Sequence, residues 1–267
     1  MLLTPELADT IRREEIAGIR CGLETARRLR PDAGIESVEV AGGLAAFMGR
    51  ESPLSEAFGI GTFAPVAAGD VAEITEFYES RASTPRVFVS PLADRTLGIE
   101  LAAAGYAPVE YENVLASNAF EPHALRDQRI RAAPNMQAWA RASAGGFLDG
   151  GTVTADDEFL ALTIAGSEGV VAVEAVDGGA IVATGAMDVR GECSALFAAS
   201  TLPGFRGAGW HLALIRDRIA RARDAGARFM RATARPGSTS ERNFHRCGFT
   251  TLYTRALWER KRDKTST

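Results

Sequence analysis

The sequence predicts an α/β fold in two similar halves, and three observations support this prediction. Segments with helical spacing alternate with short extended segments along the 267-residue chain. A hairpin signal around a glycine pair occurs twice, at Gly42-Gly43 and at Gly178-Gly179. A helix-ending glycine followed by an aromatic residue also occurs twice, at Gly105-Tyr106 and at Gly248-Phe249. Because the intervening elements recur in the same order, the chain contains a weak internal repeat.

The first half begins with a helix predicted from Thr4 to Leu29. Its apolar residues recur at helical spacing, at Ile11, Ile16, Ile19, Leu23 and Ala26. The elements expected after this helix are a hairpin over residues 38–47, a strand over Ala57–Phe63, a helix over Asp70–Ser80 capped by Asp70, a strand over Val87–Ser90 and a helix over Ala93–Ala104.

The second half follows the same order. Its expected elements are a hairpin over residues 173–182, a strand over Leu196–Thr201, a helix over Trp210–Ala225 ended by Gly226, and a strand over Phe229–Ala234. The helix has an apolar side with Leu212, Ile215, Ile219 and Ala222, and most of its remaining surface carries Arg216, Arg218, Arg221 and Arg223. Each half closes with a strand of aromatic and branched residues, namely Tyr111 and Val114 or Tyr253 and Leu257.

The boundary between the halves is expected between Asn118 and Arg131. Pro122, His123 and a charged run separate the last strand of the first copy from the start of the second. We therefore assign residues 1–120 to an N-terminal domain and residues 130–267 to a C-terminal domain. An unrelated N-terminal substrate or dimerisation domain is the alternative.

Composition is that of an ordinary globular protein, with 46% hydrophobic and 24% charged residues. The sequence lacks an apolar run long enough for a membrane helix or a signal peptide, so we expect a cytoplasmic protein without a membrane partner. The net charge of −4 argues weakly against nucleic acid as a partner. Three cysteines without a CxxC pair fit neither a disulfide framework nor a zinc cluster, and no metal is expected.

The segment with the clearest chemistry is the glycine-rich loop from Thr201 to Gly209, which joins a strand to a helix. Free amides and the helix dipole make such a junction an anion site. A Walker loop would need Lys followed by Ser or Thr where Trp210 and His211 stand. The dinucleotide fingerprint would need a third glycine where Leu212 stands and an acidic residue closing the next strand. Neither is present. The remaining reading is a diphosphate bound without a metal, as in coenzyme A.

Two segments resemble the GNAT superfamily of acyl-CoA-dependent N-acetyltransferases. The loop is similar to the family's pyrophosphate motif, Arg/Gln-x-x-Gly-x-Gly/Ala, with Arg206 and Gly209 at the first two anchors and His211 in place of the last small residue. The segment from Ser238 to Phe249 is similar to a later, Asn-bearing helix that ends in Gly-Phe. The resemblance covers roughly residues 130–260. The first half lacks an Arg-Gly-x-Gly loop and resembles a degenerate copy.

The resemblance implies a fold, a co-substrate and a binding site. Each copy would have a mixed, mostly antiparallel sheet flanked by helices, and acetyl-CoA would donate an acetyl group to a small-molecule amine by direct attack. The pantetheine arm would lie along the backbone of Ala199, Ser200 and Leu202, and Asn243 would contact the coenzyme from the later helix. The diphosphate would bind the amides of Arg206, Gly207, Ala208, Gly209, Trp210 and His211. Trp210 could instead be a core residue.

The family's usual acid is a tyrosine at the position of Phe244, which cannot donate a proton. His245 and Tyr253 are candidate substitutes, and Glu192 is the candidate base; each also has an ordinary structural reading. The main alternative function is a non-catalytic module that binds CoA or acyl-CoA, suggested by Phe244 and His211. A nucleotide-dependent enzyme is the third alternative. The sequence leaves the acceptor amine and the oligomeric state open, with a homodimer among the alternatives.

Overall fold

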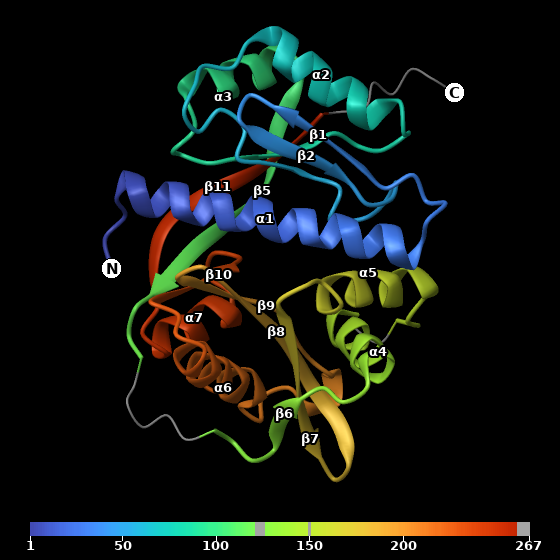
Figure 1. Cartoon of the computed structure of the whole chain (residues 1–267), viewed down its shortest axis with the longest axis vertical. Coiled ribbons are helices and arrows are strands. Elements are labelled where there is room, and N and C mark those ends of the chain that lie inside the picture. Colours follow the sequence, from blue (N-terminus) through green and yellow to red (C-terminus); the bar gives the residue numbers. More distant parts are fainter. Residues whose placement is uncertain (121–125, 149–150, 261–267) are drawn as a thin grey trace. The chain divides into compact units, whose positions relative to one another are not determined.

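The structure is a computed structural model that describes residues 1–120, 126–148 and 151–260. It contains two compact units (Figure 1). Unit 1 comprises Met1–Leu2 and Asn113–Leu252, and unit 2 comprises Leu3–Glu112 and Tyr253–Thr267. Two long strands, β5 (Tyr106–Ser117) and β11 (Thr250–Arg260), contribute residues to both units. Pro122 and His123, on which the predicted boundary partly rests, lie outside the described residues, and the domain ranges 1–120 and 130–267 stay a prediction.

Unit 2 is a sheet with helices on both faces. Its strand order is β1-β2-β3-β4-β11-β5, and β3 runs parallel to β4. In Figure 1, α1 lies on one side of β1 and β2, and α2 and α3 lie on the other. Its own elements are α1 (Pro5–Leu29), β1 (Glu36–Val40), β2 (Gly43–Phe47), β3 (Ala57–Phe58), α2 (Ala68–Glu79), β4 (Arg86–Val89) and α3 (Arg95–Ala103).

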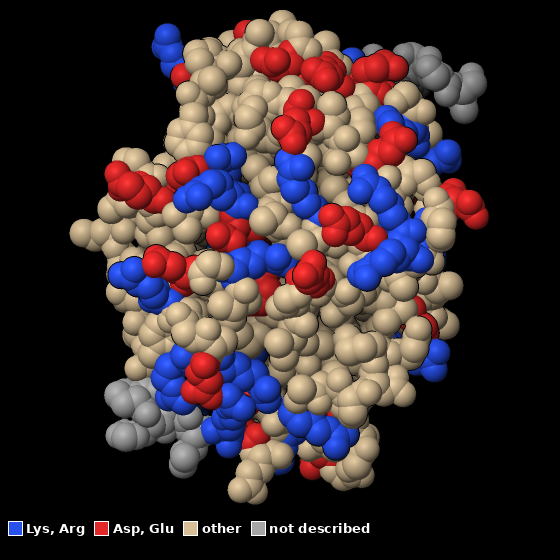
Figure 2. Space-filling model, in the orientation of Figure 1, with Lys and Arg blue, Asp and Glu red and all other residues tan. Residues whose placement is uncertain are grey.

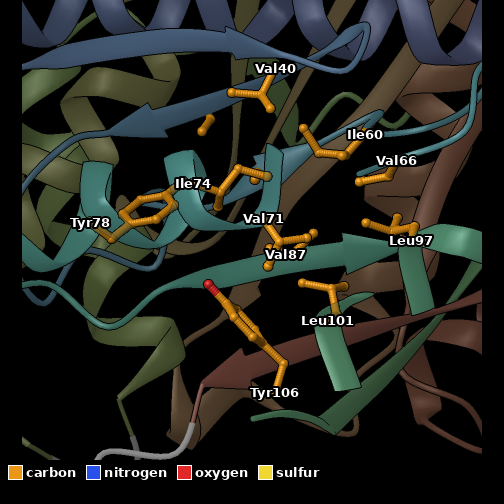
Figure 3. Packing of buried hydrophobic residues seen from close by; sticks show 12 residues of the cluster. Val40, Ile60, Val66, Val71, Ile74, Tyr78, Val87, Leu97, Leu101 and Tyr106 are labelled. Carbon is orange, nitrogen blue, oxygen red and sulfur yellow. The ribbon is translucent and has the colours of Figure 1, made fainter. Parts of the chain in front are cut away.

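Apolar side chains from most of these elements meet in one core beneath α2 and α3. Figure 3 shows Val71, Ile74 and Tyr78 of α2 packed with Val87 of β4 and Leu101 of α3. The Tyr78 hydroxyl is not left unpaired in this core, because it donates to the backbone carbonyl of Ala46 at 3.1 Å. Burial of these side chains fixes α2 and α3 on the sheet.

The first hairpin forms as predicted, with the turn one residue earlier than the glycine pair. Ala41 and Gly42 form the two-residue turn, and both have positive φ, of 44° and 77°. Gly43 is the first residue of β2. A Cβ there would lie 2.4 Å from the Phe58 carbonyl oxygen, so only glycine allows β2 to approach β3 this closely.

Two predictions in unit 2 are wrong in detail. The strand expected over Ala57–Phe63 ends at Phe58, because Gly59 and Gly61 have φ values of +71° and +67° and turn the chain. Asp70 does not cap α2 from its N-cap position. It is the third residue of the helix, and its carboxylate accepts a hydrogen bond from the amide of Ala67, the true N-cap.

Unit 1 repeats the arrangement with longer strands. Its sheet has the order β11-β5-β10-β9-β8-β7-β6, and β9 and β10 form its parallel pair. In Figure 1, α4 and α5 lie on one side of β8 and β9, and α6 and α7 lie on the other. Its own elements are β6 (Ile130–Ala132), α4 (Met136–Phe147), α5 (Ala155–Ala165), β7 (Val170–Asp177), β8 (Ala180–Arg190), β9 (Cys193–Thr201), the 3-10 turn η1 (Pro203–Phe205), α6 (Trp210–Asp224), β10 (Phe229–Ala234) and α7 (Thr239–Arg246).

Helices α4 and α5 were not among the predicted elements. Each begins with a local signal, because Asn135 accepts from the amide of Ala138, and Thr154 forms a capping box with Asp157. Gly146 lets α4 approach the sheet closely, since a Cβ there would lie 2.3 Å from the Ser200 hydroxyl. The α4 helix therefore packs directly against the end of β9.

Charged side chains of opposite sign lie next to one another along α1 (Figure 2). Asp9 pairs with Arg12 at 2.9 Å and with Arg13 at 3.1 Å, and Arg20 pairs with Glu39. This alternation gives α1 no continuous basic surface of the kind that binds a phosphate backbone. Among the helices of the described ranges, none has the length and hydropathy needed to cross a membrane.

Candidate functional site

The glycine-rich loop of unit 1 lies on the surface between β9 and α6. Gly207 and Gly209 both have positive φ, of 80° and 83°, and Gly209 is the N-cap of α6. A Cβ added at either residue would meet no atom within 4 Å. Glycine is therefore needed for the backbone conformation, and the space in front of the loop is open.

The amides of this loop are available to a ligand. The first α6 amide that donates within the chain is that of Ala213, which contacts the Gly209 carbonyl at 3.0 Å. Across the described ranges, no acceptor is found for the amides from Gly207 to Leu212. Free amides and the positive end of the helix dipole together favour a bound anion. Gly207, Ala208, Gly209, Trp210 and His211 of the predicted phosphate cradle thus lie together, while the Arg206 amide contacts the Pro203 carbonyl at 3.4 Å.

The side chain of Arg206 fixes the loop to its surroundings. Its Nε donates to the carbonyl of Thr201 at 3.2 Å, at the end of β9, and its Nη2 donates to the carbonyl of Gly146 in α4 at 3.0 Å. These bonds hold the loop against both elements, so the free amides keep a defined position before any ligand binds.

The parallel strands β9 and β10 separate in front of the loop. Their pairing runs from Cys193 opposite Phe229 to Leu196 opposite Ala232, although both strands continue beyond that point. The pairing of β9 with β8 also shifts register there, and Ala198 has a φ of +48°, which is unusual for a residue other than glycine. The second half of β9 thus leaves the parallel ladder, and we call the unpaired interval between Ala199 of β9 and Thr233 of β10 the strand gap.

The three strand residues predicted to hold the pantetheine arm differ in what they can offer. Ala199 lies at the strand gap and is half-buried. The Ser200 hydroxyl donates to the Ser143 carbonyl at 3.0 Å and lies 3.0 Å from the Thr184 hydroxyl. Both backbone groups of Leu202 are already hydrogen-bonded, the amide to Val182 and the carbonyl to the amide of Phe205.

His211 and Asn243 contact each other between α6 and α7. Asn243 Nδ2 lies 3.0 Å from His211 Nδ1, and Arg246 Nη1 donates to Asn243 Oδ1 at 3.1 Å. Burial, with a smaller contribution from the Arg218 cation, lowers the pKa of His211 to about 4. His211 is therefore neutral at pH 7. If Asn243 Nδ2 donates to Nδ1, the imidazole proton is on Nε2.

His211 and Phe244, the two residues that depart from the family pattern, are in contact. The rings of His211 and Phe244 meet edge to face, with centroids 6.0 Å apart. Phe244 is buried with Leu196 and Ala232, the last paired residues of β9 and β10. The imidazole thus lies between the free amides of α6 and the hydrophobic cluster at the base of the strand gap.

Trp210 adopts the core alternative. Its side chain is buried with Val173, Val182 and Leu214, and the guanidinium carbon of Arg129 lies 4.4 Å from the centre of its ring. The indole is not exposed for stacking on a ligand, and only the Trp210 amide remains as a candidate contact.

Glu192, the predicted base, lies at the end of β9 opposite the glycine-rich loop. It precedes the strand, is exposed and pairs with Arg228 at 2.7 Å, whereas the loop follows the strand. At about 3.3 Å per residue, the length of β9 separates Glu192 from the loop by more than about 25 Å. This exposed ion pair fits a solvated turn, and the role of Glu192 as base stays a prediction.

His245 and Tyr253 have ordinary structural surroundings. His245 Nδ1 lies 2.9 Å from the Phe249 carbonyl, and its Nε2 lies 3.7 Å from the Glu241 carboxylate. Glu241 also accepts from the Gly237 amide at 2.6 Å and from Asn113, which ties α7 to β5. Tyr253 is half-buried in the part of β11 that belongs to unit 2.

Two amides just before the corresponding helix in unit 2 are occupied. The Val66 amide donates to the Thr96 hydroxyl at 2.7 Å, and the Ala67 amide donates to the Asp70 carboxylate at 2.8 Å. A carboxylate thus stands where an anion would bind. This arrangement explains in physical terms why the first copy of the repeat is degenerate as a phosphate site.

Arg218 lies on the buried side of α6, contrary to the prediction. We expected it on the solvated side of α6, but its side chain is fully buried. The signal was present, because Arg218 stands three residues after Ile215 and four before Ala222, within the apolar stripe.

Within the described parts of the chain, no group of three or more His, Cys, Asp or Glu side chains could hold a metal ion.

Comparisons with known proteins agree with this geometry. Residues 134–249 match the acetyltransferase (GNAT) family. The chain is 17% identical to a solved GCN5-related N-acetyltransferase from Kribbella flavida, with a TM-score of 0.57 over 92% of this chain and 95% of that one. It is 16% identical to a GCN5-related N-acetyltransferase from Sphaerobacter thermophilus, with a TM-score of 0.56 over 79% of this chain and 75% of that one.

A third solved structure is a tandem GNAT protein from the clavulanic acid biosynthesis pathway. It is 11% identical to this chain, with a TM-score of 0.56 over 94% of this chain and 97% of that one. The predicted fold class, two tandem GNAT-like units with mixed sheets, is thereby confirmed. No curated protein matches the sequence.

Proposed function

Since residues 134–249 of this chain belong to the acetyltransferase (GNAT) family, whose members use acetyl-CoA, we propose that it transfers the acetyl group to a primary amine of a small molecule. The observation that carries this proposal is the row of free amides from Gly207 to Leu212 next to the strand gap. A diphosphate at the amides and an extended arm in the gap together fit a coenzyme A thioester.

In this proposal the loop binds the diphosphate and the strand gap orients the pantetheine arm. The amides of Gly207, Gly209 and His211 donate to phosphate oxygens, and the α6 dipole adds about half a positive charge. The unpaired edge of β9 near Ala199 lies along the pantetheine arm. Holding two reactants in line can remove about 7 to 11 kcal/mol from a barrier, so positioning alone supplies much of the catalysis.

Phe244 occupies the position of the family's usual acid. Phe244 is buried and has no hydroxyl group to protonate a leaving thiolate. His245 and Tyr253 stay candidates for that role, and Glu192 stays the candidate base. Because an ordinary thiol has a pKa of about 8.5, its thiolate leaves without a dedicated acid far more easily than an alkoxide would. Catalysis by positioning is compatible with the absence of the tyrosine.

The test is thiol release from acetyl-CoA with a panel of amines, followed by mass determination of the acetylated product. An acetyltransferase releases thiol steadily and in step with acetylated amine. The alternative favoured by Phe244 is a module that binds CoA without turnover. Such a module would be stabilised by the ligand, by about 2.7 kcal/mol at 100 times the dissociation constant, but would release no thiol above the rate of hydrolysis.

A further inference from the structure

A fully buried arginine stands behind the bend in β9. Arg218 of α6 has 0% of its surface exposed. Its Nη1 donates to two backbone carbonyls, those of Ala186 in β8 and Phe197 in β9, each at 3.0 Å. Its Nε donates to the Leu214 carbonyl at 3.1 Å, and Nη2 has no partner in the described parts of the chain.

The two strand carbonyls belong to the point where the ladder between β8 and β9 shifts register. Ala186 and Phe197 are opposite each other, and the next matched pair is Thr184 and Ser200. The strand β9 therefore has an extra residue in this interval, and a bulge of this kind leaves backbone groups without ladder partners. Arg218 Nη1 donates to one carbonyl on each strand beside this bulge.

The guanidinium has room because the facing residue is a glycine. An added Cβ at Gly185 would lie 3.1 Å from Arg218 Cζ and 3.2 Å from Nη1, closer than ordinary packing allows. Gly185 and Arg218 thus form a matched pair on β8 and α6. Even a methyl group at this position would have to displace the guanidinium or the strand.

The charge of Arg218 is retained although burial opposes it. Burial lowers the pKa of Arg218 to about 10, with a partial offset from Asp217, so the side chain remains a cation at neutral pH. A buried cation is a poor way to gain stability, because well-packed apolar residues often serve as well or better. The hydrogen bonds to the bulge therefore suggest a positioning role.

We infer that Arg218 is a positioning residue that holds the bulge of β9 in the conformation that keeps the strand gap open. The peptide bond is planar and trans, so a fixed Phe197 carbonyl points the Ala198 amide the opposite way. Arg218 thereby fixes both the positive φ of Ala198 and the course of β9 toward Ala199. This inference rests on the proposed function only in the experiments that measure kcat.

Arg218→Met tests the inference against Arg216→Met, a control on the same helix with an exposed side chain. CoA affinity is measured by calorimetry and kcat by thiol release. Because the amides at the start of α6 bind the diphosphate while the strand gap orients the pantetheine arm, we expect CoA affinity to fall less than kcat, and kcat to fall at least tenfold. The Arg216 variant should change neither quantity. Gly185→Ala, which crowds the guanidinium without removing it, should show the same split if Arg218→Met does not fold.

Chemical rescue separates positioning from packing. In Arg218→Ala, millimolar guanidinium should restore at least part of kcat, whereas equal urea should not. Hydrogen exchange of the 197–201 backbone gives a readout that needs no turnover: exchange should be at least tenfold faster in Arg218→Met and slow again with guanidinium in Arg218→Ala. An unchanged kcat and unchanged exchange in Arg218→Met would overturn the inference. A wild-type protein without thiol release would contradict the proposed function instead, while the exchange experiment would still decide on Arg218.

Discussion

Replacing Gly209 by glutamate tests the phosphate site with one added charge. Gly209 is the N-cap of α6, and a Cβ there would meet no atom within 4 Å, so a side chain can begin at this position without a clash. The φ of +83° costs an L-residue about 1 to 2 kcal/mol of folding free energy. A carboxylate at a helix N-terminus returns about 0.3 to 1 kcal/mol of this. We therefore expect Gly209→Glu to fold, with a loss of about 1 kcal/mol in unfolding free energy.

The effect on ligand binding should be much larger. A carboxylate about 5 Å from one phosphate charge, at an effective dielectric constant near 20, repels it by about 3 kcal/mol. This corresponds to a loss of affinity of about 100-fold or more. The assay is calorimetric titration with acetyl-CoA, at a fixed salt concentration because screening weakens the repulsion.

Two control variants test whether the loss of affinity depends on the added charge and on its position in the loop. Gly209→Gln has the same size and the same backbone strain without the charge, so its affinity should stay well above that of Gly209→Glu. Gly69→Glu places the charge in the first turn of α2, where the amides of Val66 and Ala67 are already occupied, and should leave the affinity unchanged. If Gly209→Glu bound acetyl-CoA within threefold of Gly209→Gln, the loop would not be the phosphate site.

Three further predictions concern stability. Gly146→Ala should lower the free energy of unfolding by about 1 to 3 kcal/mol in denaturant titrations, because its Cβ would lie 2.3 Å from the Ser200 hydroxyl; an unchanged midpoint would show that α4 shifts freely. Burial raises the pKa of Glu56 to about 8, so the folded state binds the extra proton between pH 4.5 and 8 and loses stability as the pH rises through that window. Glu56→Gln should therefore gain about 3 kcal/mol relative to wild type between pH 5 and pH 8, and parallel stability curves would contradict this. For His211 the pH dependence of the unfolding free energy has the opposite direction. Its pKa is lowered to about 4, so stability is lost as the pH falls from 6.5 toward 4. His211→Gln should remove about 3 kcal/mol of that loss in the same titrations.

Local sequence signals predicted the elements that depend on local chemistry. The helix over Thr4–Leu29 forms as α1 from Pro5 with Thr4 as its N-cap, and the strand over Phe229–Ala234 has the predicted limits. Gly105 and Gly248 both follow helices with positive φ, as expected of a C-terminal cap. The turn between β9 and α6 was located correctly because Gly207 and Gly209 adopt the positive φ that this turn requires.

Features that depend on distant contacts were not predictable in this way. The separation of β9 from β10 depends on a bulge at Ala198, and nothing in the sequence around that alanine favours positive φ. Arg218 is buried because Gly185, on another strand, leaves room for it.

The most direct test of the central claim is a crystal structure of the protein with acetyl-CoA. We predict that the diphosphate oxygens accept hydrogen bonds from the amides between Gly207 and His211, and that the pantetheine arm runs along β9 past Ala199. Density for the diphosphate at any other place, with those amides in contact only with water, would contradict the account.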